Sequence, residues 1–109
     1  GWVMLIQEYN VEIDNSAILV NLKRLTNQIY KLLPSREECN DWQTPLTTIN
    51  EELAGMSLLL VDQQETIFPL LCKLKGLFDL TNEDDFFLYR RMIFECLGLM
   101  NNLIKECQD

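Results

Sequence analysis

The sequence predicts an all-α fold: an antiparallel bundle of about four helices with an extended or helical arm at its N-terminus. Three observations predict it. Apolar residues recur every three or four positions in four segments, capping residues and prolines delimit these segments, and the connections between them are short. Because 109 residues provide for one core, we expect a single helical domain over 4–109 and interpret Gly1–Val3, ahead of Met4, as an expression remnant.

The first helix is predicted to run from about Ser16 to Leu33. Asp14, Asn15 and Ser16 offer capping oxygens at its start. Pro34 is expected to end it, because the residue before a proline avoids the helical region. Its apolar positions fall within an arc of about 100°. They are Ile18, Leu22, Leu25, Ile29, Leu32 and Leu33.

The second helix is predicted to begin between Asp41 and Pro45, with Thr44 as the cap and Pro45 in the first turn. The stretch 35–38 also has the pattern of a capping box, so either a separate turn precedes this helix or the helix begins early and tolerates Pro45. We interpret Trp42 as a core residue. The apolar face comprises Trp42, Leu46, Ile49, Leu53, Met56 and Leu60.

A second capping-box pattern at 62–65 predicts the start of the third helix. Pro69 interrupts its apolar stripe and predicts either a kink or a late helix start, because proline removes one hydrogen bond of the helix. The stripe comprises Ile67, Leu70, Leu71, Leu74, Leu77 and Phe78.

The fourth helix is predicted from about Glu83 to Cys107. Thr81 and Asn82 are its candidate caps, and the acids at 83–85 lie where the helix dipole favours negative charge. The main apolar face spans about 120°. It comprises Phe86, Tyr89, Ile93, Cys96, Leu97, Met100, Leu103, Ile104 and Cys107.

This last helix carries more apolar surface than one face of a bundle requires. Phe87 and Phe94 lie one heptad apart, on a flank that they share with Gly98 and that adjoins Arg91. We interpret the surplus as a subunit contact, and a two-fold homodimer is the commonest oligomer. The alternative is that the N-terminal segment covers these residues.

That segment, 5–14, alternates apolar and polar residues like a strand, although no partner strand follows it in the sequence. Ile6, Tyr9 and Ile13 also have helical spacing. The segment is either a helical extension or an arm that pairs across a dimer or lies in a groove, and we favour an arm or an irregular segment. Tyr9 and Val11 therefore join Phe87, Arg91, Phe94 and Gly98 as candidate interface residues.

Charge and composition disfavour binding of nucleic acid, a membrane span and a metal site. Seventeen acidic against nine basic residues give a net charge of −8, and the basic residues are spread over three predicted helices, which disfavours direct binding of nucleic acid. The longest apolar run, 57–61, is too short for a membrane span. The four cysteines lack metal-site spacing, and three lie in apolar helical patterns, so we expect core thiols and a reducing, cytoplasmic location.

Catalytic motifs are not apparent. Histidine is absent, and no glycine-rich phosphate loop occurs, so we assign no catalytic, cofactor or metal residues. The function predicted is a small non-enzymatic accessory or regulatory protein that binds other proteins, as a homodimer. One alternative is an acidic decoy that inhibits a nucleic-acid-binding protein. The other is a magnesium-dependent all-α nucleotide hydrolase, which requires inward-facing acids, whereas Glu51, Glu52 and the acids at 83–85 have the positions of solvated groups and caps.

Overall fold

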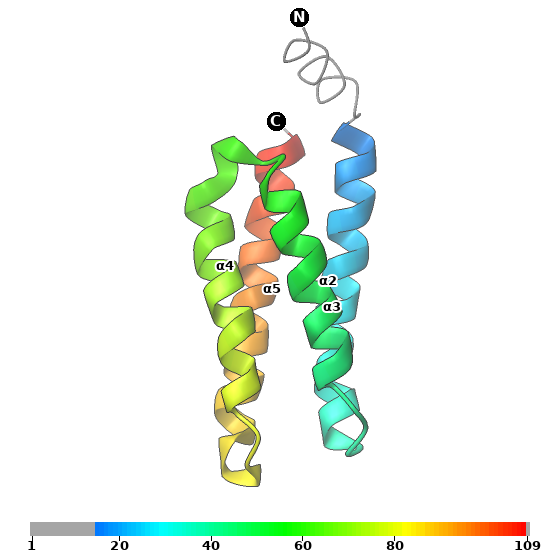
Figure 1. Ribbon diagram of the computed structural model, residues 1–109, viewed down its shortest axis with the longest axis vertical. Coiled ribbons are helices and arrows are strands. Elements are labelled where there is room, and N and C mark those ends of the chain that lie inside the picture. Colours follow the sequence, from blue (N-terminus) through cyan, green and yellow to red (C-terminus); the bar gives the residue numbers. More distant parts are fainter. Residues whose placement is uncertain (1–14, 109) are drawn as a thin grey trace, which may run out of the picture.

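Four α-helices make up most of residues 15–108, the part of the chain that the computed structural model describes (Figure 1). In chain order they are α2 (Asn15–Glu37), α3 (Gln43–Ser57), α4 (Gln64–Gly76) and α5 (Phe86–Gln108). Short 3-10 turns lie at Val61–Gln63, Leu77–Asp79 and Glu83–Asp85. No strand occurs among these residues. The all-α prediction is therefore confirmed, whereas the predicted arm, with Tyr9 and Val11, lies outside the described residues.

Each helix packs against two neighbours. Both α3 and α5 contact α2 and α4. Figure 1 shows successive helices running in opposite directions along the long axis, with the α3–α4 turn and the C-terminal end of α5 at one end of the molecule. The turns that connect α2 to α3 and α4 to α5 lie at the other end.

The apolar stripes predicted for the four helices meet in one core. All described residues of the core are apolar, and no polar or charged residue is buried among them. Ile18, Met56, Leu71 and Phe78 lie at its edge and are partly buried. The fully inaccessible side chains include Leu22, Leu25, Ile29, Leu46, Ile49, Leu53, Leu70, Leu74, Leu77, Tyr89, Ile93 and Met100.

The end of α2 differs from the prediction, because the helix continues through Pro34 to Glu37. Proline removes only one helical hydrogen bond, and the following turn is closed by two others. The Cys39 amide donates to the Arg36 carbonyl (3.0 Å) and the Asn40 amide donates to the Ser35 carbonyl (2.8 Å). These bonds form a Schellman motif, with Cys39 in the left-handed conformation at φ 60°.

At α3 the predicted start is confirmed but the predicted cap is wrong. The Asp41 carboxylate, and not Thr44, accepts the backbone amides of Gln43 (3.0 Å) and Thr44 (3.1 Å). A hydrogen bond from the Thr44 side chain, together with these two backbone hydrogen bonds, lowers the pKa of Asp41. The capping box suggested at 35–38 is also wrong, because most of those residues belong to the end of α2.

At α4 the late start considered for Pro69 is wrong, since the helix begins at Gln64 and includes the proline. The capping box predicted at 62–65 is not the start of α4, because Asp62 lies inside the 3-10 turn Val61–Gln63 and the residue before the helix, Gln63, makes no side-chain cap. Instead the Gln64 side-chain amide donates to the carbonyls of Ser57 and Leu60, both at 3.0 Å. Gln64 thereby satisfies carbonyls at the end of α3.

The start of α5 follows the prediction closely. Asn82 and Asp85 form a reciprocal capping box, in which the Asn82 amide donates to the Asp85 carboxylate at 3.3 Å. The acids at 83–85 form a 3-10 turn that leads into the α-helix at Phe86. Among the cysteines, Cys96 and Cys107 lie in the core as expected, but Cys72 is exposed on α4.

Candidate functional site

The outer side of α5 carries the most exposed of the large apolar side chains described, that of Phe87. Phe87 is 82% exposed and Phe94 is 44% exposed. The same helix buries Tyr89, Ile93 and Met100 completely on its opposite side. A helix that contacts two neighbours therefore still presents two phenyl rings to solvent.

Four residues on the outer side of α5 have the spacing of a helix-packing seam. Phe87, Arg91, Phe94 and Gly98 follow one another at intervals of four, three and four positions, which places them on one side of a helix. We call this set the α5 outer face. All four belong to the interface predicted from the sequence and are solvent-exposed, whereas Tyr9 and Val11 lie outside the described residues.

Cations border the α5 outer face. The Arg90 guanidinium lies 5.0 Å from the centre of the Phe94 ring, a cation–π contact. Arg91 pairs with Glu95 at 3.5 Å, and Glu95 also accepts a hydrogen bond from Lys73 of α4 at 2.8 Å. The Lys73 hydrogen bond lowers the pKa of Glu95, and the same bond raises the pKa of Lys73.

Gly98 lies on the α5 outer face with open space beside it. A β-carbon placed on Gly98 would meet no atom within 4 Å, so nothing in the described chain requires glycine there. Glycine within a helix is less favourable than alanine by about 1 kcal/mol. The position is therefore unexplained by the packing of a single chain.

A second polar feature, which the sequence analysis missed, lies at the end of the molecule where α2 ends and α5 begins. The Arg36 guanidinium carbon lies 4.5 Å from the ring centre of Tyr89, 5.5 Å from that of Phe86 and 5.8 Å from that of Trp42. Its Nη2 donates to the Asn82 carbonyl at 2.7 Å, while the buried Nη1 has no hydrogen-bond partner. Arg36 thus joins three elements through one side chain.

Two of the three rings, those of Trp42 and Tyr89, also contact each other, and Tyr89 makes a hydrogen bond to the backbone of α2. Trp42, which the sequence placed in the core, is 7% exposed and meets Tyr89 edge-on at 5.0 Å. The Tyr89 hydroxyl donates to the Leu32 carbonyl at 3.4 Å, and burial raises the pKa of that hydroxyl. No local pattern in the sequence could have revealed this cluster, because its members come from three separate segments.

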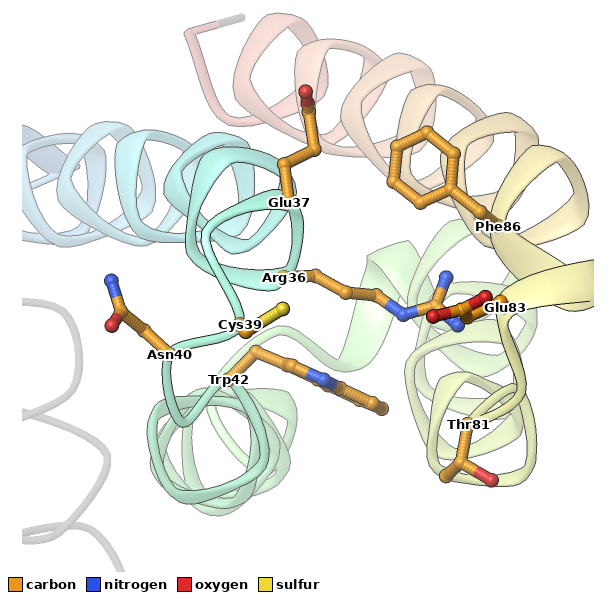
Figure 2. Close-up of a pocket in the computed structure, with 8 residues that line it drawn as sticks. All are labelled: Arg36, Glu37, Cys39, Asn40, Trp42, Thr81, Glu83 and Phe86. Carbon is orange, nitrogen blue, oxygen red and sulfur yellow. The ribbon is translucent and has the colours of Figure 1, made fainter.

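A cavity of about 500 Å³ opens beside Arg36 (Figure 2). In the close-up the Arg36 side chain extends across it, between the Trp42 and Phe86 rings. The lining residues are Arg36, Glu37, Cys39, Asn40, Trp42, Thr81, Glu83 and Phe86. The Arg36 side chain already occupies the space between the aromatic rings of this cavity. We therefore interpret the cavity as a place where helices are joined and not as a ligand-binding site.

Among residues 15–108, the acidic and cysteine side chains form no group of three that could hold a metal ion. None of the described helices has the length and apolar character needed to cross a membrane.

The structure defines the class of the chain as an all-α domain with four helices in its described part. No protein-family model matches the chain, and no curated protein or solved structure matches it either.

Proposed function

We propose that this chain is a non-enzymatic protein-interaction domain, accessory or regulatory in role, and that it binds another protein chain through the α5 outer face. The single observation that carries the proposal is the 82% exposure of Phe87 on a helix whose opposite side is buried. The four helices act in it as a rigid antiparallel bundle that holds this face in a fixed shape.

The free energy available at this face favours a protein partner. Burying an exposed phenylalanine contributes about 1.5–3 kcal/mol, and aromatic residues and arginine are the residue types that dominate binding at protein interfaces. The α5 outer face offers two phenylalanines and an arginine within about two helical turns. Gly98 allows the backbone of a partner to approach closely.

The thiols are consistent with a reducing, cytoplasmic setting for this interaction. All four cysteines are free, and Cys39 and Cys72 are exposed. Exposed thiols persist as thiols where glutathione and thioredoxin keep them reduced.

The proposal is tested by affinity capture from cells that produce the protein, with matched variants. Phe87→Asp/Phe94→Asp places two carboxylates on the α5 outer face, and Phe68→Asp makes the same change at a phenylalanine of α4 that is 69% exposed. We expect the double variant to lose the proteins that the wild type and Phe68→Asp retain. Equal recovery by all three would contradict the proposed face.

A further inference from the structure

We propose that the partner on the α5 outer face is α5 of a second copy of this chain, packed antiparallel so that Phe87 of each copy lies over Gly98 of the other. This inference rests on the proposed function, since it names the occupant of the same face. It is argued from the glycine, from the spacing of the seam and from the distribution of charge along α5.

Gly98 has no packing role within the described residues of a single chain. Two described glycines, Gly55 and Gly98, have open space where a β-carbon would lie, whereas a β-carbon on Gly76 would lie 3.1 Å from the Met92 side chain. Gly98 alone of the open pair lies on the face that carries exposed phenylalanines. A ring from another chain, seated against the backbone, would give this glycine a packing role.

The second argument is the symmetry of the seam. Phe87 and Gly98 are equally distant from a point between Met92 and Ile93, and so are Arg91 and Phe94. A two-fold axis through that point pairs residues at equal distances on opposite sides of it. One antiparallel register therefore sets both Phe87 rings over glycines and both Arg91 side chains against Phe94 rings.

The third argument is charge complementarity. In this register Glu95 of the second copy lies within one residue of the position opposite Arg91. The second copy's Glu95 then lies nearer to Arg91 than the second copy's Arg91, which is offset by three positions. The position opposite Lys105 of the second copy is Leu80, three positions before the first of the acids at 83–85. A parallel two-fold pairing would set the two Arg91 residues at the same level, and like charges at close range disfavour that arrangement.

The test is sedimentation equilibrium of the full chain up to about 200 µM, a concentration that detects weak dimers. Gly98→Ala is compared with Gly55→Ala, a matched control on α3. We expect both substitutions to raise the thermal midpoint, because alanine favours the helix. Only Gly98→Ala should weaken the dimer, by about tenfold or more, since its methyl group would occupy the space of the Phe87 ring.

The register is tested by a double-mutant cycle with Phe87→Ala and Gly98→Ala, with Phe68→Ala as the control for the ring. Each single substitution raises the dissociation constant of the dimer by some factor. If Phe87 and Gly98 touch across the dimer, the double variant should raise it by much less than the product of the two factors. Independent, multiplying effects would overturn this register. Circular dichroism of each variant verifies that it remains helical.

Failure of this inference is distinguishable from failure of the proposed function. A wild-type chain that stays monomeric over the whole concentration range, or a dimer that Gly98→Ala leaves unchanged, overturns the second copy as the occupant. The capture experiment with Phe87→Asp/Phe94→Asp then still decides whether the face binds a different protein.

Discussion

The Arg36 guanidinium lies 4.5 Å from the centre of the Tyr89 ring, so the last turn of α2 is fixed to the first turns of α5. The same side chain donates to the Asn82 carbonyl in the turn before α5. This contact explains why α2 continues past Pro34. Ending the helix at Leu33 would withdraw Arg36 from three rings and one carbonyl.

Replacing this arginine should destabilise the fold. For Arg36→Met, which keeps an alkyl chain of similar length, we expect a loss of about 1–3 kcal/mol in the free energy of unfolding, because a hydrogen bond and the cation–π contacts disappear. Arg24→Met is the control. It removes a surface ion pair with Glu52, for which about 0–1 kcal/mol is expected. Urea denaturation measures both, and equal losses would contradict a special role for Arg36.

The apolar stripes explain why so much of the fold could be predicted. Leu22, Leu25 and Ile29, for example, recur at helical spacing and are all buried. The prediction failed where a local rule was outweighed by contacts from elsewhere. Pro34 lies inside α2 because Arg36, beyond it, has partners in the turn before α5 and in α5 itself. Gln64 donates to a carbonyl of α3, and the start of its own helix, α4, has no side-chain cap.

Part of the candidate site could be predicted from the sequence and part could not. Phe87, Arg91, Phe94 and Gly98 share one helix, so periodicity alone placed them on one face. Arg36 and its rings come from three segments, and their meeting depends on how those helices pack. Cys72 shows the limit of a periodic reading, since it falls in an apolar stretch and yet is exposed.

The left-handed Cys39 should be a site where glycine stabilises the protein. A side chain at φ 60° is strained, and glycine adopts this conformation freely, although glycine also gives the unfolded chain more entropy. We expect Cys39→Gly to raise the free energy of unfolding by about 0.5–1 kcal/mol. Cys39→Ala keeps the strain and should give no such gain in the same urea titration.

The cap of α3 should give a pH-dependent contribution to stability. The pKa of Asp41 is lowered in the folded chain, so its ionised form contributes stability above the unfolded pKa of about 3.9, and this is lost as the pH falls through the lower folded value. Asp41→Asn retains an acceptor but no charge. We expect its thermal midpoint to be below that of the wild type at pH 7 and to approach it near pH 2. A constant difference would contradict the assignment.

The four thiols should fall into two reactivity classes. Cys39 and Cys72 are exposed, whereas burial raises the pKa of Cys96 to about 12 and also raises the pKa of Cys107. Cys96 therefore stays in the thiol form at pH 8, and the thiolate is the reactive form. With a thiol reagent we expect two residues to react rapidly and two only after unfolding. Rapid reaction of all four in the folded protein would contradict the burial of the core cysteines.

The central claim, that the α5 outer face meets another protein chain, is tested most directly by photo-crosslinking. A benzophenone amino acid is placed at position 87 in one variant and at position 68, a phenylalanine of α4 that is 69% exposed, in another. We predict a discrete protein adduct from position 87 and none from position 68, with mass spectrometry identifying the linked chain. No adduct from position 87, or the same adducts from both positions, would contradict the claim.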